Sequence, residues 1–464
     1  MGESDTLEAS RLLPLGIAAA LAAEGGRVSF ARFMELALTH PQDGYYARTA
    51  RLLGHRGDFT TAPRRSPAFN EAVARLLTDL VDAGRSEGAG GAEAAARSEG
   101  ASSPEGGVRR LPVIELGGGE GDLAAALLGQ WDRERPDLRD AIVYSIVEIG
   151  EELRRKQTSA LQEAVRHGWR VMWARGLGEL AGRDGGGPAP GSAVVFGNEF
   201  LDALPVHLVD VSGPAVREAW VRVVPVKSGE VGADGAADTG GAADAAGAAD
   251  TTCAAGADGA ADSAGVTRYL CVQEWGEVTR AAREELESLF GTTDAASLRP
   301  LTRDGVIELR PATKVLLGEA ASVAREVCLV TIDYGDWLAG IHDADACGPC
   351  RSQPGEVPHG RTLRGYFRHQ VTSDLCARVG HQDLTADVDF RALDMHGTAL
   401  GFETVLYVTV AEFLRGAGAE VELDRARKAA STSLDIDREA TVLAALLDPE
   451  DVGGRFKVML QVRE

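Results

Sequence analysis

The sequence of 464 residues is poor in cysteine, with only six, and their spacing does not form a disulfide framework. They are Cys253, Cys271, Cys328, Cys347, Cys350 and Cys376. Cys347 and Cys350 have the spacing of half a zinc or redox site, but no second such pair accompanies them. We therefore predict two loop cysteines, no metal site, and a reducing location: the cytoplasm, or the mitochondrial matrix if the source is eukaryotic.

Positive charge is scarce as well, because 48 lysines and arginines face 70 aspartates and glutamates, for a net charge of −22. Binding a nucleic-acid backbone requires a cationic surface, so this composition argues against nucleic acid as a partner. A basic protein partner suits the charge better. Part of the acidity lies in residues 229–262, which contain seven acids and no lysine or arginine. A net negative charge also favours solubility.

Long apolar runs are absent. Residues 12–23 are apolar, but Glu3, Asp5 and Glu8 precede them and Arg11 is the one nearby cation, which is not the pattern of a signal peptide. This run predicts a helix. No run of eighteen apolar residues occurs elsewhere, so no membrane-spanning helix is predicted.

Two segments, 85–107 and 227–265, contain almost no large apolar side chains and consist mainly of alanine, glycine, aspartate and serine. Such segments cannot contribute to a core, and we predict that both are disordered insertions. Residues 215–226 and 266–275, on either side of the second insertion, are rich in valine, tryptophan and tyrosine. They predict an antiparallel hairpin with an enlarged tip.

The remaining sequence alternates strand and helix patterns, which is typical of an α/β protein with a mainly parallel sheet. Strands are expected at 113–116, 143–149, 170–174, 193–199 and 328–334, helices at 122–131 and 151–166, and a late antiparallel strand at 401–410.

A glycine-rich loop follows the first of these strands, in the order Glu115, Gly117, Gly119, Gly121 and then helix. Glycine allows a sharp turn and a close approach of a cofactor to the backbone. The third glycine comes one residue too early for the dinucleotide pattern, and Asp122 would repel a pyrophosphate. S-adenosylmethionine has no phosphate and carries cationic groups, so the loop favours this cofactor. A nicotinamide-dependent Rossmann enzyme stays open as an alternative.

Two further features lie where strands of the predicted sheet end. Glu148 ends the second strand, where a carboxylate can accept hydrogen bonds from the hydroxyls of a ribose; it could also be a solvated strand-end acid. Asn198, Glu199 and Asp202 follow another buried strand, at the edge where open α/β sheets bind ligands. The alternative for this segment is that Asn198 or Asp202 caps a helix.

These segments together resemble the MidA-like methyltransferase family, whose mitochondrial member assists the assembly of respiratory complex I and methylates an arginine side chain. The similar segments are 28–46 (VSFARFMELALTHPQDGYY), 57–63 (GDFTTAP) with Ser66 and Phe69, 114–124 (IELGGGEGDLA), 147–157 (VEIGEELRRKQ), 197–207 (GNEFLDALPVH), 332–335 (IDYG), 360–369 (GRTLRGYFRH), 383–390 (DLTADVDF) and 447–459 (LDPEDVGGRFKVM). They cover nearly the whole chain outside the two insertions.

The resemblance implies a Rossmann-like class I methyltransferase sheet with an N-terminal helical extension and inserted and C-terminal additions. It implies S-adenosyl-L-methionine as cofactor, a loop of Gly57, Asp58, Phe59 and Thr60 folded over it, and a protein substrate such as a respiratory complex I subunit. One departure concerns the substrate: Arg64 and Arg65 stand where relatives commonly have an acidic and then an apolar residue. Gly150 stands where relatives often have serine.

We expect five parts along the chain: an N-terminal helical extension with the GDF segment (1–84), the first insertion (85–107), the first half of the core (108–226), the second insertion (227–265), and the remainder of the core with C-terminal additions (266–464).

Methyl transfer to a guanidinium requires a group that orients the acceptor and removes its proton. Glu199 and Asp202 are the candidates, since a spacing of three places them on one face if a helix follows the strand. Asn198 is expected to hold the substrate or the cofactor's amino group, and His207, His369 and His381 are weaker candidates for a base. The competing function is an assembly chaperone that retains the cofactor fold without catalysis.

Overall fold

The chain folds into two compact units in a computed structural model. One, here named the core unit, combines Thr60–Asp202, Ala312–Ile341 and Asp387–Glu464; the other, the companion unit, combines Met1–Phe59, Ala203–Pro311 and His342–Ala386. The residues that the structure describes are 12–49, 66–98, 110–181, 191–226, 252–254, 268–302, 304–337, 362–368, 370–421, 423–424 and 434–464.

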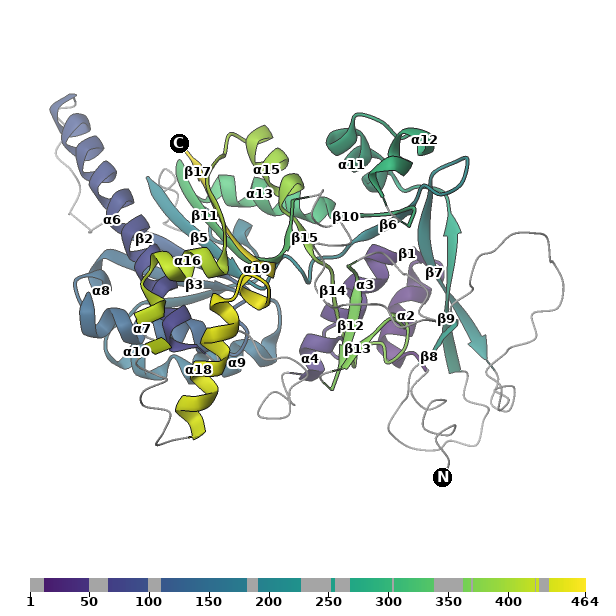
Figure 1. The fold of residues 1–464 in the computed structure, drawn as a ribbon, viewed down its shortest axis with the longest axis horizontal. Coiled ribbons are helices and arrows are strands. Elements are labelled where there is room, and N and C mark those ends of the chain that lie inside the picture. The colour runs from purple at the N-terminus through teal and green to yellow at the C-terminus, as the bar shows by residue number, and fades with distance from the viewer. Residues whose placement is uncertain are drawn as a thin grey trace. The chain divides into compact units, whose positions relative to one another are not determined.

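The core unit is built on a mainly parallel sheet (Figure 1). Its strand order is β16-β17-β11-β5-β2-β3-β4. Its strands are β2 (Leu111–Leu116), β3 (Ile142–Val147), β4 (Val171–Ala174), β5 (Ser192–Asn198), β11 (Glu326–Asp336), β16 (Glu403–Thr409) and β17 (Phe456–Arg463), and β15 (Val388–Asp389) pairs with the end of β11. Strands β4, β3, β2, β5 and β11 are parallel neighbours, and β17 is antiparallel to β11 and β16. The α/β fold with a late antiparallel strand is confirmed.

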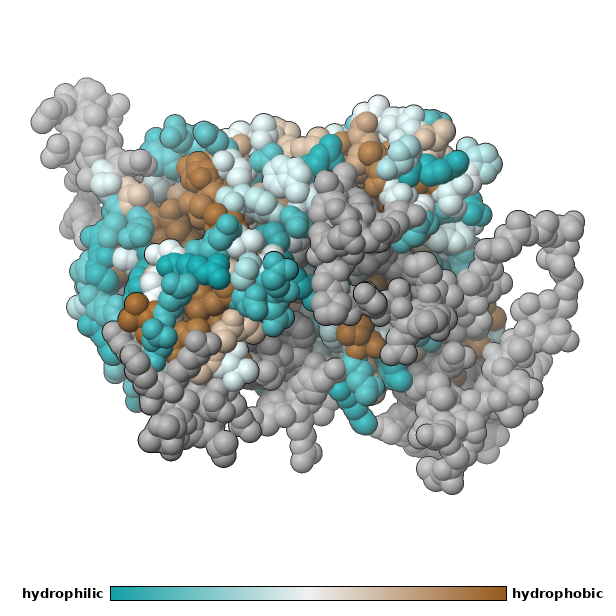
Figure 2. All heavy atoms as spheres, in the orientation of Figure 1, coloured by the Kyte–Doolittle hydropathy of each residue, from teal (hydrophilic) through white to brown (hydrophobic). Residues whose placement is uncertain are grey.

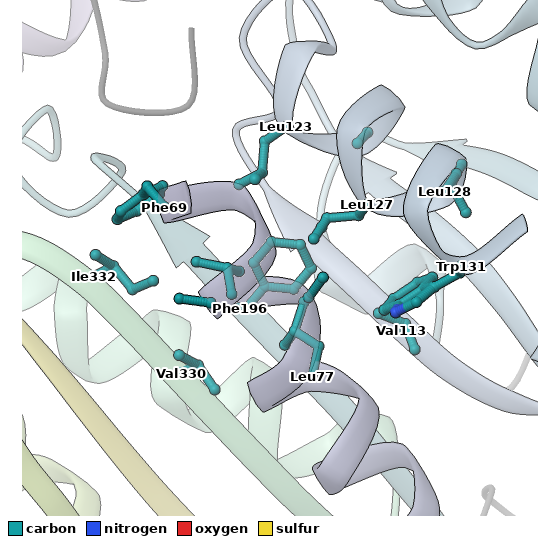
Figure 3. Close-up of a cluster of buried hydrophobic side chains, with 14 of the residues drawn as sticks. Phe69, Leu77, Val113, Leu123, Leu127, Leu128, Trp131, Phe196, Val330 and Ile332 are labelled. Atoms are coloured by element: carbon teal, nitrogen blue, oxygen red, sulfur yellow. The ribbon is translucent and has the colours of Figure 1, made fainter. Parts of the chain in front are cut away.

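Helices cover this sheet. They are α6 (Pro67–Ser98), α7 (Asp122–Glu134), α8 (Leu138–Ala141), α9 (Glu151–Ala160), α10 (Gln162–Arg166), α13 (Pro311–Val323), α15 (Phe390–Ala399), α16 (Val410–Gly416), α18 (Leu434–Leu447) and α19 (Val452–Arg455), with the 3-10 helix η1 (Leu177–Glu179). On one face of the sheet, apolar side chains of α6 and α7 pack against every second residue of the strands, such as Val113 of β2 and Phe196 of β5 (Figure 3). The intervening strand residues Ile114 and Val195 are also fully buried, so both faces of the sheet are covered.

Helix α6 continues to Ser98, so the prediction of disorder for 85–107 is wrong for its first part. The composition explains the difference. Alanine has the highest helix propensity, and residues 92–97 read AEAAAR, so this apolar-poor stretch can extend a helix whose first turns are anchored in the core.

The companion unit contains a sheet of order β10-β6-β7-β9-β8, with β1 on β7, and a three-stranded sheet of order β13-β12-β14. Its strands are β1 (Arg27–Ser29), β6 (His207–Asp210), β7 (Arg217–Val226), β8 (Thr252–Ala254), β9 (Arg268–Gly276), β10 (Val306–Leu309), β12 (Arg364–Phe367), β13 (Gln370–Thr372) and β14 (Asp383–Thr385). The helices are α2 (Leu15–Ala23), α3 (Phe30–Thr39), α4 (Tyr45–Thr49), α11 (Arg280–Phe290) and α12 (Ala295–Leu298), with η2 (Arg299–Leu301).

Strands β7 and β9 pair antiparallel from Glu218 with Gly276 to Val226 with Arg268, which confirms the predicted hairpin. Within the segment 227–265, β8 pairs with β9, a strand that the composition did not predict. The run beginning at Leu12 forms helix α2, as predicted.

The division into units differs from the boundaries expected along the chain. Residues 203–311 lie between β5 and β11 in the sequence but belong to the companion unit together with the N-terminal segment. The two segments are linked because β1 pairs with β7, whose residues are 190 or more positions further along the chain. Such long-range pairing has no local signature, so 1–84, 108–226 and 266–464 each contain residues of both units.

Among the described residues, no helix is long and apolar enough to span a membrane. Hydrophilic side chains cover much of the face of the core unit seen in Figure 2, with smaller hydrophobic patches between them.

Candidate cofactor and acceptor site

Three neighbouring parallel strands of the core unit end at one edge of the sheet. Leu116 at the end of β2 pairs with Val147 of β3 on one side and with Gly197 of β5 on the other. The glycine loop, Glu148 and Asn198 each follow directly, so the register brings together the three sequence features predicted to form the site. This is the carboxyl edge, where open α/β sheets bind ligands.

The glycine loop adopts a backbone that other residues rarely take. Gly117, Gly119 and Gly121 have φ angles of 65°, 52° and 94°, all in the left-handed region. A Cβ on Gly117 would lie 2.6 Å from the ring of Phe200, whereas a Cβ on Gly119 would meet no atom within 4 Å. The loop is therefore packed on its Gly117 side and open at Gly119, which leaves room for a ligand beside the backbone.

Glu115 lies beneath the loop and is buried, with 3% of its surface exposed. The Tyr144 hydroxyl donates a hydrogen bond of 2.8 Å to its Oε2 atom. Burial raises the pKa of Glu115 to about 7, the Tyr144 hydrogen bond opposes that rise, and the nearby Glu148 carboxylate adds to it. A Cβ on Gly118 would lie 3.3 Å from this carboxylate, so Glu115 supports the loop from below.

Glu148 is also buried, with 7% exposed, and burial raises its pKa. Its Oε1 atom accepts a hydrogen bond of 2.7 Å from the Gly150 backbone N–H, and its Oε2 atom accepts one of 3.3 Å from the Gln157 side chain. Each carboxylate oxygen has two lone pairs, so these donors leave acceptor capacity for ribose hydroxyls.

The segment after β5 is a turn built around Asp333 of β11. The Oδ2 atom of Asp333 accepts hydrogen bonds from the backbone N–H groups of Phe200, Leu201 and Asp202, at 3.2, 2.9 and 3.2 Å. Asp333 is fully buried. A carboxylate that accepts three backbone N–H groups fixes the course of the chain, so β11 determines where the side chains after β5 point.

The described residues directly after β5, 199–206, form bends and turns instead of a helix, so the expectation that Glu199 and Asp202 share a helix face is wrong, as is the capping alternative. Glu199 has a φ of 50°, in the left-handed region, which turns the chain away from helical geometry. Asn198 donates a hydrogen bond of 3.2 Å to Glu199, and both are partly exposed. Asp202 is buried, and the Tyr334 hydroxyl donates a hydrogen bond to it.

Three residues that shape the site were not among the predicted site residues: Asp333, Tyr334 and Gln157. All three lie in segments that carry the family resemblance, 332–335 and 147–157. That resemblance marked the segments without indicating roles, because the partners of Asp333 are 131 to 133 positions away in the sequence.

Several predicted residues fall outside the described part of the chain. They are Gly57, Asp58, Phe59, Thr60, Arg64, Arg65, Cys347, Cys350 and His369. The other two histidines lie in the companion unit with partners there. The Nδ1 atom of His207 lies 2.6 Å from Glu218, and the Nε2 atom of His381 lies 2.7 Å from Arg48.

Comparison with known proteins defines the class of this fold and site. A family model described as S-adenosyl-L-methionine-dependent methyltransferase matches residues 97–408, more than half of the chain. The chain belongs to this family, and S-adenosyl-L-methionine is its cofactor. The resemblance to the MidA-like methyltransferases is thereby confirmed.

Curated relatives are more distant. The mitochondrial protein arginine methyltransferase NDUFAF7 of Mus musculus is 26% identical over 222 residues, 44% of this chain and 44% of the relative. The Homo sapiens protein of the same name is 23% identical over 219 residues, 43% of each chain. The match thus spans less than half the length of these relatives.

Among solved structures, a methyltransferase-like protein of Burkholderia thailandensis bound to S-adenosyl-homocysteine has a TM-score of 0.65. It is 24% identical, with 99% of this chain and 92% of that one covered. The fold is therefore shared with that protein over nearly the whole chain, and the parallel sheet of the core unit is the class I methyltransferase-like part.

Proposed function

We propose that the protein transfers the methyl group of S-adenosyl-L-methionine to a guanidinium nitrogen of an arginine in a client protein, a subunit of a respiratory complex. The names of the curated relatives support the acceptor, and the family supports the donor. The observation that carries the proposal is the turn held by Asp333, which directly follows Asn198 and Glu199 and places Phe200 beside Gly117 of the glycine loop.

The residues at the carboxyl edge suit this cofactor. Gly119 leaves space beside the backbone for the bound molecule, and Glu148 offers carboxylate oxygens for the ribose hydroxyls. When bound, the cofactor supplies a methyl group on a cationic sulfur. Buried carboxylates on the protein side favour that charge, whereas they would repel a pyrophosphate.

With the cofactor bound, the acceptor nitrogen would take up the methyl group, and the sulfur would keep the electron pair of the broken carbon–sulfur bond. The guanidinium must then release one proton. Glu199 is the group proposed to orient the guanidinium and accept this proton, because it is partly exposed and Asn198 restrains it by a hydrogen bond. Asp202, buried against Tyr334, is proposed to position the turn.

The test is transfer of labelled methyl groups from S-adenosyl-L-methionine to a lysate of cells that lack this enzyme, followed by mass spectrometry of the labelled band. We expect methylarginine in one basic client protein. Glu199→Gln should reduce the transfer rate about a hundredfold or more, a typical loss for a group that transfers protons, while S-adenosyl-homocysteine binding is retained.

Label on a residue other than arginine would contradict the proposed acceptor. A client that co-purifies with the protein but receives no label would favour the chaperone alternative instead.

A further inference from the structure

Gln157 of α9 lies buried between the glycine loop and Glu148, with none of its surface exposed. Its Nε2 atom donates to the Gly119 carbonyl at 2.9 Å and to Oε2 of Glu148 at 3.3 Å. One side-chain amide therefore connects the most open residue of the loop with the carboxylate proposed to bind the ribose.

Trp173 of β4 determines which way this amide points. Its indole Nε1 donates a hydrogen bond of 2.9 Å to Oε1 of Gln157. An indole N–H can only donate, so the amide oxygen must face Trp173 and both amide hydrogens face Gly119 and Glu148. The same end of β4 also holds Glu148 through its backbone, because Ala174 accepts a hydrogen bond of 2.9 Å from the Glu148 N–H.

Close packing keeps Gln157 in this place. A Cβ on Gly118 would lie 3.4 Å from the amide nitrogen of Gln157, and a Cβ on Gly121 would lie 3.2 Å from its Cα. Glycine at these two positions lets α9 approach the loop closely enough for the amide to reach Gly119.

We infer that Gln157, oriented by Trp173, is a positioning residue that fixes Glu148 and the glycine loop in the geometry that binds the cofactor ribose. The inference rests on the proposed role of Glu148. Without the amide, the buried carboxylate keeps its backbone donors at Gly150 and Ile149 but loses its side-chain donor, and the Gly119 carbonyl loses its side-chain donor as well.

The experiment measures binding of S-adenosyl-homocysteine, and of its analogue that lacks the ribose 2′-hydroxyl, by titration calorimetry to the full-length protein. Gln157→Met should weaken binding of S-adenosyl-homocysteine about tenfold, and binding of the analogue by less than about threefold. Trp173→Phe, which removes the orienting hydrogen bond and keeps an aromatic ring at this position, should weaken binding of S-adenosyl-homocysteine about threefold with the same selectivity.

Gln130→Met is the matched control. Gln130 is a buried glutamine of α7 whose amide donates to Glu134 at 3.1 Å, away from the loop. This variant should bind both ligands like the wild type. Melting of each cofactor-free variant separates a loss of stability from a loss of affinity.

Wild-type affinity in Gln157→Met, or equal losses for both ligands, would overturn the inference. If Gln157→Met does not fold, Trp173→Phe decides, since the half-buried indole leaves a small change in packing. The outcome is separate from the proposed acceptor: a protein that shows these binding losses but never methylates arginine would leave the role of Gln157 intact.

Discussion

Replacing Glu115 by glutamine should make the protein more stable at neutral and alkaline pH. Folding raises the pKa of this carboxyl from 4.5 to about 7, chiefly through burial. Below pH 4.5 the group is protonated in both states and its contribution to stability is complete. Between pH 4.5 and 7 the carboxyl ionises in the unfolded chain but stays protonated in the folded protein, so the contribution falls with pH and is lost once the pH passes the folded pKa of about 7.

The magnitude follows from the two pKa values. At about 1.4 kcal/mol per pH unit, the wild type loses about 3 kcal/mol between pH 4.5 and pH 7 through this one group. Glutamine has the shape of the protonated acid, and its carbonyl can still accept the Tyr144 hydroxyl. Glu115→Gln should therefore exceed the wild type by up to about 3 kcal/mol at pH 8 and equal it near pH 4.5.

The assay is urea unfolding of the cofactor-free protein at several pH values between 4.5 and 8, with tryptophan fluorescence as the signal that reports unfolding. Trp131 and Trp169 report on the core unit, since both are buried there. Tyr144→Phe is an informative companion, because loss of its hydrogen bond should raise the pKa of Glu115 further and move the transition to higher pH. Parallel stability curves for the wild type and Glu115→Gln across this range would refute the reasoning.

Three more predictions follow from the site and the hairpin. Gly119→Val should abolish S-adenosyl-homocysteine binding in calorimetry, because a branched side chain would occupy the open side of the loop. The protein should still fold, with a free energy of unfolding lower by about 1–3 kcal/mol, because valine is strained at a φ of 52°. Wild-type affinity would show that Gly119 is not in the cofactor site. Asp333→Asn should lower the free energy of unfolding by about 2–4 kcal/mol and stop methyl transfer, because an amide cannot accept all the backbone N–H groups that reach both carboxylate oxygens. An unchanged melting temperature would mean that the turn after β5 does not depend on Asp333. Replacing residues 227–267 by Asn-Gly should leave the melting temperature and cofactor binding unchanged, because Val226 and Arg268 are already paired and a two-residue turn suits a hairpin. A large fall in melting temperature would show that the replaced segment, with β8, stabilises the companion unit.

The positions of the parallel core strands along the chain and the edge where the site lies could be predicted because both depend on local patterns. A short apolar strand followed by glycines and a helix is visible at Glu115 to Asp122, and parallel strands bring their carboxyl ends together without further information. The positions of Gly117, Glu148 and Asn198 therefore followed from sequence spacing alone.

The conformation after β5 could not be predicted in this way. The residues of the segment 197–205 are compatible with a helix. The observed turn is imposed by Asp333, which lies on β11, a strand that follows the companion-unit residues 203–311 in the sequence. The same limit applies to β1, which finds its partner β7 far along the chain. Contacts of this kind depend on the assembled sheet, and one sequence gives no local sign of them.

The electrostatic character of the carboxyl edge is a final consequence of these contacts. Four buried carboxylates of the core unit lie in or under the site: Glu115, Glu148, Asp202 and Asp333. Their hydrogen bonds described above come from hydroxyl, amide and backbone N–H groups, which are neutral donors. Neutral donors stabilise a carboxylate without cancelling its charge, so each of these acids adds negative potential at the edge when it is ionised, and burial, which raises the pKa of Glu115 and Glu148, limits their share at neutral pH. A negative potential attracts the sulfonium of S-adenosyl-L-methionine and repels the pyrophosphate of a nicotinamide dinucleotide, so it suits the methyl donor of this family.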